Sequence, residues 1–334
     1  MWRGNMENKM KTLDAKLARI RSGRYTPKDF IIADAKDGDM GFGRAAPGPR
    51  RGEVETLKSK TDYLAAMTEM TRSGLVDIML MSASSCETLS VKGFFTKSKV
   101  TPAVRLNDAT DIWSQRASSY RETESYPFRT ARPEKIKKMS DLGLYSVTFS
   151  NDVEADLYSL EEYGKFREET TKAKVRHFLE IFNPNMDIGV KPGEIGTYIN
   201  DCIVRTLAGV MSAEHPLFLK LQYNGAAAME ELASYDPGKL IVGILGGARG
   251  TTRDTFELAA QSEKYGGRVA LFGRKINFAE APLELVRLMR HVIERGIGAA
   301  EAVTAYHDHL VKHKLKPDRD IKMDIEITDP VLKG

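Results

Sequence analysis

Apolar residues in this chain gather in short continuous runs that recur along most of the sequence. Runs of this kind, bounded by Gly, Asn or Pro, are typical of strands buried on both faces of a parallel sheet. Eight such runs follow one another, and most are separated by segments with helical spacing. The predicted strands are residues 30–35, 76–81, 102–106, 144–149, 175–182, 217–223, 239–245 and 267–272.

This order of elements predicts an α/β fold, a single-domain (β/α)8 TIM barrel, because eight is the number of parallel strands that closes one. We assign residues 28–314 to the barrel, residues 1–27 to an N-terminal helical extension and residues 315–334 to a polar, irregular tail. A doubly wound sheet is the alternative. It normally carries a GxGxxG turn after its first strand, whereas KDGDMGFG at 36–43 has a different order of glycines.

Two helical segments lie outside the run of strands. Residues 9–22 predict an amphipathic helix placed to close the bottom of the barrel, and residues 280–314 predict one long helical tail. Helices between the strands are predicted at 56–73, 85–92, 133–142, 158–173, 193–212 and 251–265, with a short one after residue 225.

Residues 107–131 form a long polar connection that carries Arg116, Arg121 and Arg129. Long loops in compact domains are often functional. These arginines are therefore candidates for a lid that contacts a second phosphate or carboxylate of a substrate. A solvated charged loop is the alternative.

Composition narrows the class of protein. The 334 residues are 42% hydrophobic and 29% charged, and 50 basic against 46 acidic residues leave a net charge of +4. The two signs are interleaved, so we expect no nucleic-acid partner. No apolar run approaches the ~20 residues of a membrane span, and no signal-peptide core is present. With only Cys86 and Cys202, the sequence favours a reducing compartment, and we expect a cytoplasmic protein.

One lysine lies inside the sixth predicted strand. Lys220 follows an apolar run within HPLFLKLQYNG, residues 215–225. Burial disfavours the ammonium and lowers the pKa of a lysine. The neutral amine is the form that attacks a carbonyl carbon to make a Schiff base. The alternative is an ordinary lysine whose amine reaches solvent from the end of the strand.

In a TIM barrel the residues at the C-terminal ends of the strands meet on one face. Here they bring a lysine, several carboxylates and two glycine turns together, which favours the catalytic interpretation. In strand order, these residues are Lys36, Asp37 and Asp39 (first), Arg105 and Asn107 (third), Glu180 (fifth), Lys220 (sixth), Gly246, Gly247 and Arg249 (seventh), and Gly273 and Arg274 (eighth).

The glycines follow the seventh and eighth strands, where TIM barrels commonly bind phosphate. Gly246, Gly247 and Gly273 allow backbone N–H groups to approach an anion. Arg274 adds a bidentate, charge-assisted contact. Either turn alone is compatible with an ordinary tight turn, but the two together predict a phosphate site.

Three stretches resemble the class I, Schiff-base aldolase superfamily of deoxyribose-phosphate, archaeal-type fructose-bisphosphate and tagatose-bisphosphate aldolases. FLKLQYNG (218–225) resembles the strand with the imine-forming lysine, and the stretch from ILGG to FGRKIN (244–277) resembles the phosphate-binding end. VRLNDATDI (104–112) is similar to the third-strand segment, and ADAKDGDMG (33–41) matches more loosely. The resemblance covers roughly residues 28–295 and is most specific in the last third.

The resemblance implies that Lys220 is the nucleophilic amine and Asp37 a polar partner of the lysine or the substrate. Archaeal-type fructose-bisphosphate aldolases place Trp-x-Tyr at the end of strand five, where this chain has Glu180-Ile181-Phe182. Glu180, as in the tagatose-bisphosphate branch, is therefore the acid/base candidate. The Asp-His-Gly of the first strand is replaced by Asp37-Gly38-Asp39, without the histidine. The residues predicted to bind substrate or phosphate are Gly246, Gly247, Gly273, Arg274, Arg105 and Asn107.

The implied reaction is C–C bond cleavage or formation in a phosphorylated or similarly anionic sugar, through a lysine imine, with no metal and no cofactor. Alternatives are an acyl-transferring or transaldolase-like relative and a non-catalytic barrel that binds a phosphorylated metabolite. The histidines of HDHLVKH, residues 307–313, do not all share one helical face, so we predict no metal site there. Because barrels of this family usually self-associate, a homo-oligomer is expected.

Overall fold

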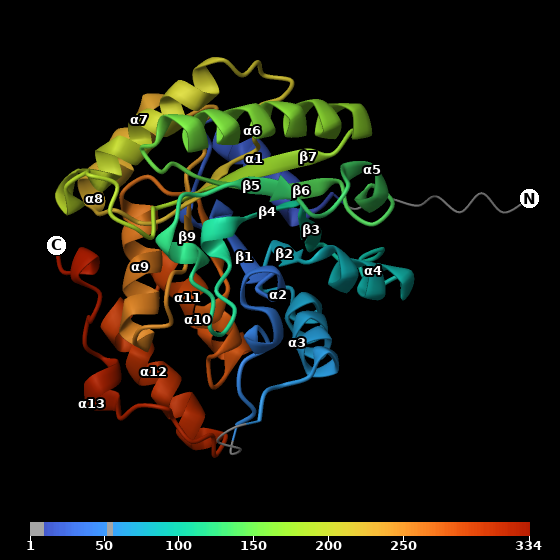
Figure 1. Ribbon diagram of the computed structural model, residues 1–334. Helices are drawn as coiled ribbons and strands as arrows, with labels where there is room; N and C mark the ends of the chain where they lie inside the picture. The colour runs from blue at the N-terminus through green and yellow to red at the C-terminus, as the bar shows by residue number, and fades with distance from the viewer. Residues whose placement is uncertain (1–9, 52–55) are drawn as a thin grey trace, which may run out of the picture.

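The computed structural model describes residues 10–51 and 56–334. Within them, eight parallel strands close into a barrel in chain order, and the last strand pairs with the first (Figure 1). The predicted TIM barrel is therefore confirmed. Its strands are β1 (Ile31–Lys36), β2 (Ile78–Met81), β3 (Thr101–Arg105), β6 (Leu142–Thr148), β7 (Arg176–Phe182), β8 (Leu219–Leu221), β9 (Gly243–Leu245) and β10 (Val269–Phe272).

Helices surround the barrel, and local side-chain contacts fix where several of them begin. At the start of α9, Thr251 Oγ1 accepts a hydrogen bond from the Asp254 N–H, and the Asp254 carboxylate accepts one from the Thr251 N–H. This reciprocal capping box satisfies two N–H groups that a helix start otherwise leaves unpaired. The helices are α1 (Thr12–Arg21), α2 (Asp39–Phe42), α3 (Lys60–Ser73), α4 (Ala83–Val91), α5 (Pro133–Ile136), α6 (Val153–Ala173), α7 (Ile195–Ala208), α8 (Ala226–Tyr235), α9 (Thr252–Lys264), α10 (Arg274–Asn277), α11 (Pro282–Ile293), α12 (Ala299–Lys312) and α13 (Ile321–Asp324).

Apolar side chains fill the lower part of the barrel. Phe178 of β7 and Phe218, which directly precedes β8, stack with their ring centroids 4.6 Å apart, and both belong to one buried apolar cluster. Helix α1 joins the same cluster, so it closes the N-terminal end of the barrel as residues 9–22 led us to expect; residue 9 and those before it lie outside the described residues. The residues of α1 that pack there are Leu13, Leu17 and Ile20.

The long connection after β3 is an ordered hairpin, which we call the hairpin segment (residues 107–131). Its strands β4 (Asn107–Ala109) and β5 (Pro127–Arg129) pair antiparallel. They are three residues long, too short for a period to be read from the sequence. The Ser114 N–H donates to the Gly41 carbonyl at 2.8 Å, which ties the segment to α2, the short helix after β1.

The chain after β10 differs from the single long helix predicted at 280–314. Two helices, α11 and α12, are separated at residues 294–298, where Arg295 has a positive φ of 61° and Gly296 follows it. Beyond α12, the chain folds back onto α9. The Thr328 N–H donates to Asp254 Oδ1 at 2.8 Å, and Leu332 is buried. The final residues thus lie beside the start of α9.

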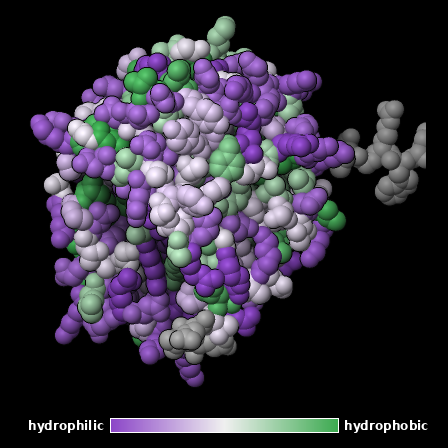
Figure 2. Space-filling view, viewed as in Figure 1, coloured by the Kyte–Doolittle hydropathy of each residue, from purple (hydrophilic) through white to green (hydrophobic). Residues whose placement is uncertain are grey.

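On the face shown in Figure 2, hydrophilic residues cover most of the surface and hydrophobic ones are scattered among them. The apolar faces of the helices turn toward the barrel; Val286 and Met289 of α11, for example, are fully buried. None of the helices in the described residues is long and apolar enough to cross a membrane.

A buried histidine near the start of β7 makes the stability of the fold depend on pH. Burial, together with the charges of Arg167 and His215, lowers the pKa of His177 to about 3. Its Nε2 lies 2.9 Å from the Tyr163 hydroxyl. In the unfolded chain a histidine titrates near pH ~6.5. Between these two values the unfolded chain binds a proton that the folded chain does not, so stability falls as the pH falls.

We therefore expect the free energy of unfolding to decrease below pH ~6.5 by up to about 1.4 kcal/mol per pH unit from this group. Urea unfolding at pH values near 7 and 5 measures this. The His177→Gln variant should lose less stability over that interval than the parent protein, whereas His291→Gln, at an exposed histidine of α11, serves as the control. An unchanged acid dependence in His177→Gln would assign the effect to other groups.

Candidate active site

Three polar side chains form a row across adjacent strands inside the barrel. In the register of the sheet, Ser146 of β6 is opposite Glu180 of β7, and Glu180 is opposite Lys220 of β8. Each lies two residues beyond an apolar, inward-facing residue in or directly before its own strand, such as Phe178 or Phe218. Because strand side chains alternate between faces, the row also points into the barrel, directly above the apolar layer.

The row is part of a buried ionic network with two cations and two carboxylates. Lys220 Nζ lies 2.5 Å from Glu180 Oε1, and Arg105 Nη2 donates to Glu180 Oε2 at 2.8 Å. Arg105 also donates from Nε to Asp37 Oδ2 at 2.6 Å and from Nη1 to Ser146 Oγ at 2.8 Å. The Ser146 hydroxyl in turn donates to Glu180 Oε2 at 2.7 Å. The formal charges of the network cancel, so burying it leaves no isolated charge.

Electrostatics keep the supporting members of the network ionised. Burial alone would raise the pKa of Asp37, but the charges of Arg105 and Lys220 outweigh burial and hold that pKa below its usual range. Burial disfavours the Arg105 guanidinium, but the Asp37 and Glu180 carboxylates outweigh this and raise its pKa. Arg105 is thus a permanent cation that fixes two carboxylates around Lys220.

These residues open into a cavity of about 420 Å³ at the C-terminal ends of the strands, which we call the inner cavity. It brings together eight of the nine predicted site residues: Asp37, Arg105, Glu180, Lys220, Gly246, Gly247, Gly273 and Arg274. Phe182 lines it as well. Ile112 of the hairpin segment and Phe42 form part of its wall.

The glycine turns present backbone N–H groups at the rim of this cavity. Gly247 has a positive φ of 65°, a conformation that favours glycine, and Gly273 approaches β1 so closely that a Cβ would lie 2.8 Å from the Ala35 carbonyl oxygen. The N–H groups of Gly247, Ala248, Gly273 and Arg274 donate to no group in the described part of the chain. Such unpaired N–H groups are suited to binding an anion.

Some strand-end residues lie outside the inner cavity. The Asn107 side chain pairs with the backbone of Ser146, donating to its carbonyl and accepting from its N–H, both at 2.7 Å. Lys36 binds both carboxylate oxygens of Asp34 at 2.8 Å, away from Lys220. Asp39 pairs with Lys60, and Arg249 with Asp318.

Sequence reasoning missed two residues of the site. Ser146 lies within the predicted strand 144–149, and strand alternation relative to Leu144 would have placed it inside the barrel. Tyr63 lines the inner cavity from α3, and burial, with the charges of Asp39 and Asp37, raises its pKa well above the usual value. Because Tyr63 comes from the first turn of a helix, no strand-end pattern could reveal it.

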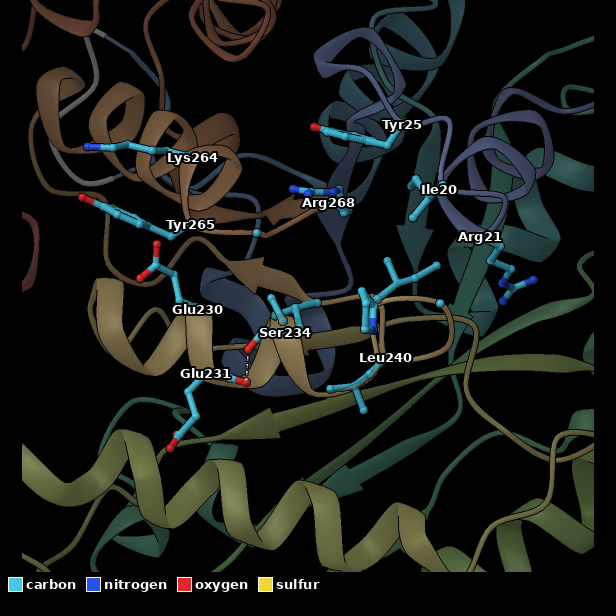
Figure 3. A pocket seen from close by; sticks show the side chains of 17 residues that line it. Ile20, Arg21, Tyr25, Glu230, Glu231, Ser234, Leu240, Lys264, Tyr265 and Arg268 are labelled. Atoms are coloured by element: carbon cyan, nitrogen blue, oxygen red, sulfur yellow. Dashed lines mark hydrogen bonds between the residues drawn. The ribbon is translucent and has the colours of Figure 1, made fainter.

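Another hollow, of about 810 Å³, lies at the opposite end of the barrel (Figure 3). It is bordered by α1, α8 and α9, and in it the Arg268 guanidinium stacks 4.0 Å from the centre of the Tyr25 ring. None of the predicted site residues lines it.

Of the tail histidines, His307 pairs with Asp324, and His309 lies near Glu284. Within the described residues, no His, Cys, Asp and Glu side chains gather in a group of three suited to a metal.

No family model matches this sequence, and no curated protein matches it. Solved structures do. An archaeal fructose 1,6-bisphosphate aldolase aligns with a TM-score of 0.62 at 14% identity, over 84% of this chain and 99% of that one. The fructose-bisphosphate aldolase of Slackia heliotrinireducens DSM 20476 aligns with a TM-score of 0.64 at 14% identity, over 89% and 90% of the two chains.

A third match is an archaeal fructose-1,6-bisphosphate aldolase whose catalytic lysine is covalently bound to the carbinolamine intermediate of its substrate. Its TM-score is 0.61 at 15% identity, over 84% of this chain and 99% of that one. At these identities the likeness establishes the shared barrel fold.

Proposed function

We propose that this protein is a class I aldolase that makes or breaks a C–C bond in a phosphorylated or similarly anionic sugar through an imine on Lys220. The observation that carries the proposal is the buried contact of Lys220 with Glu180, 2.5 Å apart, inside a cavity whose rim presents unpaired N–H groups and Arg274. The structural likeness to Schiff-base-forming aldolases supports the same reaction class.

Imine formation requires a neutral amine, and Glu180 is placed to supply one. It accepts a proton from the Lys220 ammonium, and the free amine attacks the carbonyl carbon of the substrate while the carbonyl oxygen takes up a proton. The resulting carbinolamine loses water, with Glu180 returning its proton to the departing hydroxyl. Arg105 and Ser146 hold the other oxygen of Glu180, so Oε1 stays directed at Lys220.

The protonated imine then acts as an electron sink. A carboxylate, Glu180 or Asp37, removes a proton from the substrate hydroxyl, the adjacent C–C bond breaks, and its electrons pass to the imine to give an enamine and a free aldehyde. Protonation and hydrolysis of the enamine release the ketone and restore Lys220. The anion site holds the remote end of the substrate and aligns the reacting carbonyl.

Borohydride trapping tests this proposal. The protein is incubated with a panel of ketose and aldose phosphates in the presence of a chelator, reduced, and examined by mass spectrometry and peptide mapping. We expect an adduct on Lys220, whose mass identifies the substrate class. A folded protein that forms no adduct with any carbonyl compound would instead favour a non-catalytic barrel that binds a phosphorylated metabolite.

Ser146 should act as a positioning residue for Glu180. Its replacement by alanine removes one hydrogen bond to the carboxylate and leaves Arg105 Nη1 without an acceptor. We expect a loss of about 1–3 kcal/mol in the free energy of unfolding and a roughly tenfold slower rate of adduct formation. Samples reduced with borohydride at timed intervals give the rate of adduct formation, and denaturant unfolding gives the free energy of unfolding.

The matched control is Ser140→Ala. Ser140 is also buried and donates to the Pro102 carbonyl at 2.7 Å, but it lies two residues before β6, at the end of the barrel opposite Lys220. It should lose stability without a change in the rate of adduct formation, and Ser146→Thr should restore part of the rate. Equal rates in Ser146→Ala and the parent protein would show that Arg105 alone orients Glu180.

A further inference from the structure

Two arginines from distant parts of the chain face one space outside the inner cavity. Arg121 belongs to the hairpin segment, and Arg274 follows β10. Both line a larger cavity of about 1240 Å³, the outer cavity, which shares Gly246, Gly247 and Arg274 with the inner cavity. An anion at this junction is therefore within reach of both the barrel rim and the hairpin segment.

Neither guanidinium forms an ion pair with a carboxylate in the described residues. Asp111, an acidic residue of the outer cavity that lies near the charge of Arg121, accepts hydrogen bonds from Ser125 and Thr148. Arg121 donates to the side-chain oxygen of Asn185 at 2.7 Å, and Arg274 stacks over the ring of Phe42 at 5.2 Å from its centre. Arg129 of the same segment differs, because it forms ion pairs with Glu162 and Glu169. Arg121 and Arg274 thus keep their charge available.

The two guanidiniums also lie close enough to repel each other. Burial lowers the pKa of Arg274, and the charge of Arg121 lowers it further. A bound anion would convert this repulsion into two attractions. The unpaired N–H group of Gly247, which lines both cavities, lies on the barrel side of the same space, and that of Gly273 lies in the adjoining inner cavity.

We propose that Arg121 and Arg274 bind one dianionic, phosphate-type group of the substrate from two sides, so that the anion joins the hairpin segment to the barrel rim. Two planar guanidiniums and convergent N–H groups match the several oxygens of a phosphate. This proposal names the group bound at the end of the substrate remote from the carbonyl, and for the carbonyl end it rests on the proposed function. Binding of the anion alone can be measured separately from the aldolase reaction.

Inorganic phosphate is the probe for this site. Its affinity is measured by calorimetry at constant ionic strength for the full-length protein and for Arg121→Gln, Arg274→Gln and the double variant. Each single change should weaken binding by about tenfold or more, because each removes charge-assisted hydrogen bonds. The double variant should lose less than the product of the two single losses, since both groups bind the same ion.

Arg116→Gln is the matched control. Arg116 is an exposed arginine of the same hairpin segment, outside the residues that line either cavity. Its replacement should change phosphate affinity less than about twofold, whereas Arg121→Lys should bind with intermediate affinity. Wild-type affinity in Arg121→Gln, or an equal loss in Arg116→Gln, would overturn the two-sided site.

A second readout separates this inference from the aldolase reaction. With a phosphorylated ketose, Arg121→Gln should raise the concentration needed for half-maximal borohydride trapping by about tenfold or more. With dihydroxyacetone, which lacks the phosphate, trapping should be unchanged. Phosphate binding that needs both arginines, in a protein that forms no adduct at Lys220, would reject the aldolase and retain the anion site.

Discussion

Replacing Lys220 with methionine should abolish borohydride trapping and lower any aldol activity by roughly 10⁴-fold or more, because no other group supplies the amine. Methionine keeps a long side chain but removes the charge beside Glu180. Glu180 keeps its contacts with Arg105 and Ser146, so the barrel should still form, with a loss of roughly 3–5 kcal/mol at most from breaking a buried pair. Mass spectrometry after reduction measures the adduct, and circular dichroism the fold.

Other buried lysines provide internal controls for this experiment. Lys36 is as buried as Lys220 but is held by Asp34, and Lys275 lines the outer cavity with a pKa that burial lowers to about 8. Neither should carry an adduct in the parent protein. Lys220→Arg keeps the cation and should fold even if the methionine variant does not, and it should also remain unlabelled. An adduct that maps to Lys275, or persists in both variants, would contradict the assignment.

Replacing Glu180 with glutamine should separate the binding of substrate from the chemistry. Glutamine retains an oxygen that accepts hydrogen bonds from Arg105 and Ser146, but it cannot exchange a proton with Lys220. We expect turnover to fall by about 10²–10⁴-fold, the usual effect of losing an acid/base group. The rate of aldehyde release and the rate of adduct formation should both be measured, since Glu180 is placed to act in both steps.

Glu162→Gln is the matched control for that variant. Glu162 is a buried glutamate on α6 that pairs with Arg129 and Lys165, outside the cavity around Lys220. Its replacement should affect stability and leave turnover unchanged. If Glu180→Gln retained full turnover, the proton transfer would have to be assigned to Asp37, whose carboxylate shares Arg105 with Glu180.

The barrel and most of its site were predictable because both depend on simple periodicities. Each strand was visible as a continuous apolar run, and closing eight parallel strands places all their C-terminal ends on one face. Lys220 and Glu180 were found in this way although they lie 40 positions apart, because the sheet register makes them direct neighbours. The glycine turns also predicted a phosphate site, because a turn that presents backbone N–H groups depends on backbone geometry and not on particular side-chain contacts.

Features that depend on side-chain contacts between elements were not predictable. Asn107 occupied a strand-end position, but its side-chain amide forms hydrogen bonds with the backbone N–H and carbonyl of Ser146 and does not line the cavity. The hairpin segment was predicted only as a long polar connection, either a lid or a solvated loop. Its fold was not visible because its strands are short and its core is a small aromatic cluster around Trp113. The break between α11 and α12 includes Arg295, with its positive φ, and Gly296, whereas the apolar spacing continues across both.

The closure of the barrel by α1 has a consequence for the order in which this protein folds. Helix α1 is made before the strands of the barrel during synthesis, yet Arg21 donates to the Leu217 carbonyl and Asp14 pairs with Arg176, far along the chain. Strand β1 likewise pairs with β10, near the other end of the barrel. Such distant contacts form slowly, and the apolar face of α1 has no complete partner until the last strands emerge from the ribosome. Chaperone dependence during synthesis should therefore be concentrated on this N-terminal helix.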